Sequence, residues 1–237
     1  MGTLTALVLA TPIFGFALAP PEVSTVALSS APQAQIEVAA ESVLAVAAAA
    51  SQSAAEKQQY RDQLRKRAKL AKIHRTMGIA TWAATAVAVI AGTIQYRNLY
   101  GKPFASELGD TPCVQGNAWP NQDQCHGGPW LHAIPGFAAG ALYFSTLGLE
   151  MAMPDPDDAA AGDSKYAKTL RTHKALRWVH LAGMAVQIVT GIIVANPGLA
   201  LDRANDYDTL KKLGGLHLGS GLVTLGALTW AGSIMLF

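Results

Sequence analysis

Four long apolar stretches, separated by short polar segments, fill the last two thirds of the chain. Each is close to the roughly 20 residues that a helix needs to cross the hydrocarbon core of a membrane. Each ends at polar residues, at proline and glycine, or at the C-terminus. We therefore predict four transmembrane helices, at Arg75–Gln95, Trp130–Met153, Lys174–Ala195 and Leu213–Phe237.

The residues before the first apolar stretch fall into two parts. Residues 1–21 hold an apolar run closed by Pro20 and Pro21, and Ala17–Ala19 resembles a signal-peptidase site. Because no Lys or Arg precedes this run and a proline follows the site, an uncleaved membrane anchor is the alternative to a signal peptide. Residues 22–71 are Ala-rich and then basic, which is typical of a linker or a polar helix.

The composition agrees with a membrane protein. Of the 237 residues, 51% are hydrophobic and only 14% are charged, which is too apolar for an average soluble domain. The net charge of +2 is small and gives no reason to expect a nucleic-acid partner. The expected surroundings are lipid.

The positions of Lys and Arg predict which ends of the helices face the cytoplasm. Eight of them lie between Lys57 and Arg75, and five lie in the connection before and at the start of the third stretch. The other two connections contain five Lys and Arg residues in total. Since cytoplasmic loops carry the excess of positive charge, the basic N-terminal segment should be cytoplasmic, in a bacterial inner membrane or an organelle membrane.

The two cysteines, Cys113 and Cys125, both lie in the first connection, on the face opposite to the basic segment. That compartment is oxidising in a bacterial periplasm, so we expect a disulfide. The rival interpretation is a metal site formed with His126, but it lacks a fourth ligand and a standard zinc spacing.

The apolar stretches form a tandem repeat of two helices. The first and third align without gaps from His74 and His173, and Gly92 and Gly191 follow eighteen residues later. The second and fourth align at Leu131–His132 and Leu216–His217, with a glycine four residues after each histidine. This repeat predicts an all-α four-helix transmembrane bundle over residues 72–237 with approximate internal symmetry.

The histidines then form two pairs by depth. The first and third helices run in one direction, so His74 and His173 lie near the cytoplasmic face. The second and fourth run in the other direction, which places His132 and His217 near the opposite face. Two imidazoles facing each other from different helices are the axial ligands that a six-coordinate haem iron requires. We therefore predict two b haems, and no catalytic residue.

One helix offers a second candidate ligand. His180 lies seven residues after His173 on the same helix face, and the repeat favours His173 because it aligns with His74. The histidine that is not a ligand would hydrogen-bond a propionate or a substrate. We also expect Pro135 in the first turn of the second helix, which would put His132 at the helix cap.

Glycines and charges around the histidines add detail. Gly78, Gly136 and Gly221 each lie four residues after a histidine, where a flat porphyrin could approach the backbone, although small residues also serve ordinary helix packing. Glu150 is placed to meet Arg177. We interpret the acidic residues at 155, 157 and 158 as a solvated loop. Four cations near the cytoplasmic pair could hold propionates or extend to the interface: Lys72, Arg75, Arg171 and Lys174.

With these residues the chain resembles the cytochrome b561 superfamily over residues 72–237, through the four helix-start histidines and the glycines that accompany them. The resemblance implies a four-helix core that binds two b haems on opposite sides of a membrane. The chain departs from that family at Arg177, at the extra His180 and in its long cysteine-bearing loop. The family's reductant-binding lysine and arginine motifs are not found, so ascorbate is not implied as donor.

The sequence thus predicts transmembrane electron transfer, with a quinone or a redox protein as donor or acceptor. The alternative is an accessory subunit of a larger respiratory or photosynthetic complex, with histidines that bind chlorophyll, lipid or nothing. A transporter with histidine proton relays is disfavoured, because these histidines lie at the ends of the apolar stretches.

Overall fold

The computed structural model describes residues 31–102, 107–125, 130–196, 198 and 201–236. The predicted signal peptide or anchor at residues 1–21 lies outside the described residues, as does His126. The chain divides into two units, Met1–Ser53 and Ala54–Phe237, and the second contains every candidate ligand.

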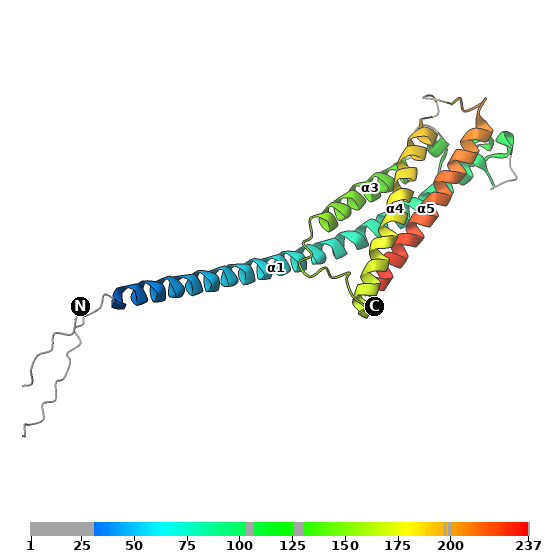
Figure 1. The fold of residues 1–237 in the computed structure, drawn as a ribbon. Helices are drawn as coiled ribbons and strands as arrows, with labels where there is room; N and C mark the ends of the chain where they lie inside the picture. Colours follow the sequence, from blue (N-terminus) through cyan, green and yellow to red (C-terminus); the bar gives the residue numbers. More distant parts are fainter. Residues whose placement is uncertain (1–30, 103–106, 126–129, 197, 199–200, 237) are drawn as a thin grey trace, which may run out of the picture. The chain divides into compact units, whose positions relative to one another are not determined.

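All the regular secondary structure of the described residues is helical, and these residues contain no strand. The elements in chain order are α1 (Ala31–Tyr100), η1 (Leu108–Asp110), α2 (Pro112–Gln115), η2 (Gln122–Cys125), α3 (Trp130–Met151), α4 (Lys165–Ala195) and α5 (Tyr207–Leu236). Within the second unit, the last part of α1 lies beside α3, α4 and α5 (Figure 1). Helices α1 and α4 run in one direction and α3 and α5 in the other, as the repeat predicts.

Three of the described helices are long and apolar enough to cross a membrane: Ser53–Tyr100, Lys165–Ala195 and Tyr207–Met235. Residues 22–71 are predicted from the sequence as a linker or a polar helix. From Ala31 onward this segment is helical, and the same helix continues into the first span. The remaining long helix, α3, has 22 residues and is not among the helices that meet this criterion. The four predicted spans thus correspond to four helices, of which three meet the criterion for a span.

The helices extend beyond the apolar windows, because polar contacts support their ends. Ser164 caps α4 by accepting a hydrogen bond from the Ala167 backbone N–H at 3.0 Å. Helix α1 continues through Tyr96–Asn98, which the sequence marks as a stop. There the Asn98 side chain holds the Trp119 backbone, donating to its carbonyl at 2.6 Å and accepting from its N–H at 3.2 Å.

The position of Pro135 corrects one prediction. Helix α3 begins at Trp130, so Pro135 lies inside the helix and not in its first turn. His132 is consequently a helical residue rather than a cap. Proline has no backbone N–H, so one intrahelical hydrogen bond is missing at this position. The position is close to the start of the helix, where only a few intrahelical hydrogen bonds have formed.

Small residues let the helices approach closely. A Cβ atom added to Gly183 of α4 would collide with the hydroxyl of Thr224 on α5, which is fully buried. Thr81 of α1 lies 3.2 Å from the Thr146 hydroxyl of α3. Where the backbones approach this closely, side-chain packing and hydrogen bonds between helices stabilise the bundle, as is typical of membrane helices.

Candidate functional site

The first histidine pair consists of His74 on α1 and His173 on α4. Their ring centres are 6.2 Å apart, and the ring planes are close to perpendicular at 76°. The second histidine pair consists of His132 on α3 and His217 on α5, with ring centres 5.8 Å apart and planes at 88°. The structure therefore brings together the two pairs that the repeat predicts.

The pairs lie toward opposite ends of the helices. The His74 ring contacts the last turns of α3, whereas His132 contacts α1 fourteen to eighteen residues beyond His74. At 1.5 Å per residue this corresponds to roughly 21–27 Å along α1. The two sites are separate, and each is formed by two helices that run in the same direction.

Backbone carbonyls fix the rings of the first pair. His74 Nδ1 lies 3.1 Å from the carbonyl oxygen of Thr146, and His173 Nδ1 lies 3.0 Å from that of Ala231. The two carbonyls occupy equivalent positions in the repeat, fourteen residues after His132 and His217. The same contact is thus made twice, once in each half.

The second pair is fixed in a similar way. His132 Nδ1 lies 2.9 Å from the carbonyl oxygen of Ala88, and His217 Nδ1 lies 3.0 Å from the hydroxyl oxygen of Thr190. A carbonyl oxygen only accepts, so the Nδ1 atom opposite it carries the hydrogen. The Nε2 atom of such a ring keeps its lone pair, which is the form in which histidine binds a metal.

The distances between ring centres can be compared with the separation expected for two imidazoles that bind one metal ion. An imidazole nitrogen lies about 2 Å from its metal, as in zinc proteins, so two imidazoles on opposite sides of one ion place their ring centres roughly 6 Å apart. The observed 6.2 and 5.8 Å agree with this separation. Both pairs therefore fit an iron with two axial histidines, as in a b haem.

Two glycines face the second pair, and sequence reasoning missed their role. A Cβ atom on Gly92 would lie 2.9 Å from His132 Cε1, and one on Gly191 would lie 3.0 Å from His217 Cε1. Any larger residue would displace the imidazole. The sequence feature that could have indicated this role is the equal spacing of Gly92 from His74 and of Gly191 from His173. The expected glycines at 78 and 136 have nothing within 4 Å of an added Cβ atom.

A cavity of about 350 Å³ surrounds the second pair. Its volume lies within the range of about 300–1,000 Å³ that is typical of small-molecule and cofactor sites. Both histidines line it, together with the two facing glycines and small residues of all four helices, among them Gly136, Gly140, Gly221 and Ala139. The cavity provides space beside the imidazoles, on the side where the glycines lie.

His180 has a different surrounding from the two pairs. It is buried, and its Nδ1 lies 2.9 Å from the phenolic oxygen of Tyr143 on α3, which is also buried. The ring centres of His180 and Tyr143 are 5.5 Å apart. In the repeat, His180 is equivalent to Thr81 rather than to His74. The structure therefore places His173, and not His180, opposite His74.

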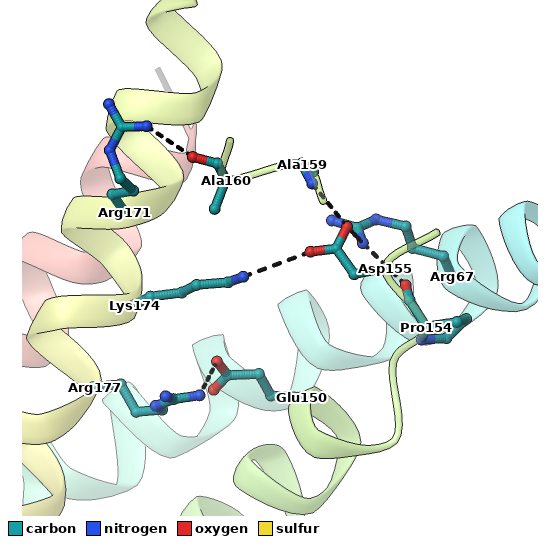
Figure 2. A network of polar contacts seen from close by, with 9 residues as sticks. All are labelled: Arg67, Glu150, Pro154, Asp155, Ala159, Ala160, Arg171, Lys174 and Arg177. Carbon is teal, nitrogen blue, oxygen red and sulfur yellow. Dashed lines mark hydrogen bonds and ion pairs between the residues drawn. The ribbon is translucent and has the colours of Figure 1, made fainter. Parts of the chain in front are cut away.

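A polar network joins α4 to α3 and to the loop between them, residues 152–164 (Figure 2). Arg177 pairs with Glu150 at 2.8 Å, as expected from the sequence. Lys174 lies 3.5 Å from Asp155, which also pairs with Arg67 of α1. Arg171 donates to loop carbonyls, including that of Ala160 at 2.7 Å.

The acidic residues at 155, 157 and 158 are exposed, as the solvated-loop prediction requires, and Asp155 also forms ion pairs with Arg67 and Lys174. The hydrogen bond from the Ala159 backbone N–H, together with the charges of Arg67 and Lys174, lowers the pKa of Asp155 below its ordinary value of 3.8. The Asp155 side chain is partly exposed, at 28%. Lys174 and Arg171 are thereby engaged with the loop, whereas Lys72 and Arg75 are exposed.

At the other end of the helices, Cys113 and Cys125 form the predicted disulfide, with Cα atoms 5.5 Å apart. The loop that they close is anchored to the bundle. Gln95 donates to the Gln124 carbonyl at 2.7 Å, and Arg203 donates to the Cys125 carbonyl at 3.0 Å. Because both cysteines are in the disulfide, neither provides the thiolate that the rival metal site requires.

Within the described residues there is no cluster of three or more His, Cys, Asp or Glu side chains suited to a metal ion. A haem iron needs only two protein ligands, because the porphyrin supplies the other four. Compared with protein-family models, curated proteins and solved structures, the chain gives no match.

Proposed function

We propose that residues 54–237 form a four-helix membrane cytochrome that holds two b haems and transfers electrons across the membrane. The geometry of the two histidine pairs carries this proposal. In each pair two imidazoles from different helices face each other at the separation that one iron requires. The resemblance to the cytochrome b561 superfamily at the four helix-start histidines points to the same function.

The proposal needs α3 as a fourth span. Its 22 residues extend about 33 Å at 1.5 Å per residue, which matches the hydrocarbon thickness. Its buried face contacts the neighbouring helices through His132 and Tyr143. Its outer face carries Ile134 and Phe137, which are 63% and 81% exposed, as expected for contact with lipid.

When bound, each haem would supply an iron that changes between the ferrous and ferric states without an open coordination position. The chain's own residues orient the ligands. The carbonyls of Thr146 and Ala231 hold the first pair, and the carbonyl of Ala88 holds His132. With both axial positions filled by protein, electron transfer is favoured over binding of oxygen.

The charge distribution supports one orientation in the membrane. The basic segment of α1 and the connection between α3 and α4 lie at the same end of the helices, next to the first pair. The positive-inside rule assigns this end to the cytoplasm. The disulfide at the other end agrees with an oxidising compartment there.

Absorption spectroscopy of the purified full-length chain tests the proposal. We expect a b-type spectrum in the reduced protein and two haems per chain. A folded preparation without haem absorbance would overturn the proposal. Absorbance from chlorophyll, or a haem-free chain that co-purifies with a larger complex, would favour the accessory-subunit alternative.

Paired substitutions test which histidines share an iron. His74→Leu and His217→Leu should each remove one haem. His74→Leu combined with His173→Leu should remove no more haem than His74→Leu alone. In contrast, His74→Leu combined with His132→Leu should remove both haems. Loss of both haems in the first combination would contradict the pairing.

A further inference from the structure

One of the four ring contacts differs in kind from the other three. His217 Nδ1 meets the hydroxyl oxygen of Thr190 at 3.0 Å. The other three histidines meet backbone carbonyl oxygens, those of Thr146, Ala88 and Ala231. A single side chain therefore determines the environment of one ligand in the second pair.

The direction of this hydrogen bond follows from the second contact of the hydroxyl. Thr190 Oγ1 donates its only hydrogen to the carbonyl of Val186 at 2.6 Å. Its lone pairs remain, so the hydroxyl accepts from the Nδ1–H of His217. Thr190 is buried at 6% exposure, which limits replacement of this contact by water.

The two halves of the repeat explain why only His217 uses a hydroxyl. Thr190 lies seventeen residues after His173, and the equivalent residue after His74 is Ala91, which has no polar side chain. The first half therefore cannot form this bond, and His132 bonds to the carbonyl of Ala88 instead.

The residue equivalent to Ala88 also differs. It is Gln187, whose side chain fills the space between α4 and α5 and lies 3.4 Å from the position of a Cβ atom on Gly221. The Gln187 amide donates to the carbonyl of His217 and, at 2.6 Å, to the hydroxyl of Ser220. With this larger side chain in place, the His217 ring contacts Thr190 one turn further along α4.

We infer that Thr190 is a positioning residue that orients His217 and sets the reduction potential of the haem held by the second histidine pair. The inference rests on the proposed haem sites. An acceptor opposite Nδ1–H makes the imidazole a more basic ligand, which favours ferric iron. Second-shell hydrogen bonds of this kind are one of the means by which a protein adjusts a haem potential.

The experiment is a redox titration of the full-length chain, followed by visible absorption. Thr190→Val keeps the shape of the side chain and removes the acceptor. We expect two haems to remain, with the potential of one moved upward and that of the other unchanged. The same titration in a His74→Leu background, which leaves only the second pair intact, should show the upward shift in the remaining haem.

Two further variants separate the hydrogen bond from packing. Thr190→Ser keeps the hydroxyl and should have the potentials of the unmodified protein. Thr93→Val is the control, because Thr93 donates to the carbonyl of its own helix at Val89, as Thr190 does at Val186, but is exposed and lies outside the cavity lining. It should leave both potentials unchanged.

The outcomes are distinct. Unchanged potentials in Thr190→Val with two haems bound would overturn the inference and leave the proposed function standing. A shift of equal size in Thr190→Ser would also overturn it, since the hydroxyl would not be the cause. If Thr190→Val loses a haem, restoration by serine supports the inference and failure of serine overturns it. Absence of haem from the unmodified protein would overturn the proposed function and the inference together.

Discussion

Tyr143 and His180 share a hydrogen bond of 2.9 Å between the phenolic oxygen and Nδ1, in the buried contact between α3 and α4. This bond gives His180 a partner other than a metal. It leaves His173, one turn from the ion pair of Arg177 and Glu150, as the histidine that faces His74.

Replacing His180 should therefore affect stability and not haem content. His180→Leu leaves the Tyr143 hydroxyl buried without a partner, which costs about 1–3 kcal/mol. Combining it with Tyr143→Phe should recover part of that loss. Thermal unfolding in detergent measures the first effect and haem content measures the second. Loss of one haem in His180→Leu would identify His180 as a ligand instead.

The glycines that face the second pair should not tolerate a methyl group. Gly191→Ala places a Cβ atom 3.0 Å from His217 Cε1, so the imidazole must shift by a few tenths of an ångström from its position opposite His132. We expect haem content to fall from two per chain to one. Gly140→Ala is the control, because it lines the same cavity and has nothing within 4 Å of an added Cβ atom. Equal haem content in the two variants would contradict the role of Gly191.

The ion pairs of Asp155 should stabilise the protein in a pH-dependent manner. Because its pKa is lowered by folding, the contribution is present above the ordinary value of 3.8 and is lost as the pH falls through the folded value. For a partly exposed pair the effect is at most about 1 kcal/mol.

Asp155→Asn should therefore unfold more readily than the unmodified protein at neutral pH, and the difference should disappear in acid. Thermal unfolding at several pH values measures this. Asp163→Asn, in an exposed residue of the same loop, provides the comparison. A difference that persists unchanged in acid would show that charge is not its cause.

The orientation of the chain can be tested by cysteine labelling. After reduction, a membrane-impermeant thiol reagent should reach Cys113 and Cys125 from outside the cytoplasm, and without reduction it should label neither. A cysteine introduced as Lys69→Cys in a cysteine-free chain should be labelled only after the membrane is permeabilised. Labelling of that residue in intact cells would reverse the assigned orientation.

The sequence was sufficient to predict the two histidine pairs, because equal spacing along helices that run in the same direction gives equal depth. It was not sufficient for the contacts that hold the rings. The rotation of each helix about its axis decides whether a carbonyl such as Ala88 or a hydroxyl such as Thr190 meets an imidazole. That rotation follows from packing across several helices.

Two local differences have similar causes. Asp155 is the exposed loop residue that the sequence predicts, but its ion pair was not predictable, because Arg67 lies 88 residues away and reaches it only after the chain folds back. Helix α1 continues past its predicted stop because Tyr96 and Tyr100 pack against Gly214 on α5. In both cases a residue distant in sequence decides the local structure.

Each histidine pair takes one member from the first half of the repeat and one from the second, since α1 meets α4 and α3 meets α5. An iron bound by either pair would therefore cross-link the two halves. Neither half alone carries both ligands of a site, so cofactor loading and association of the halves become linked equilibria. Haem supply would then govern how much of the chain reaches its assembled form, as well as whether it can carry electrons.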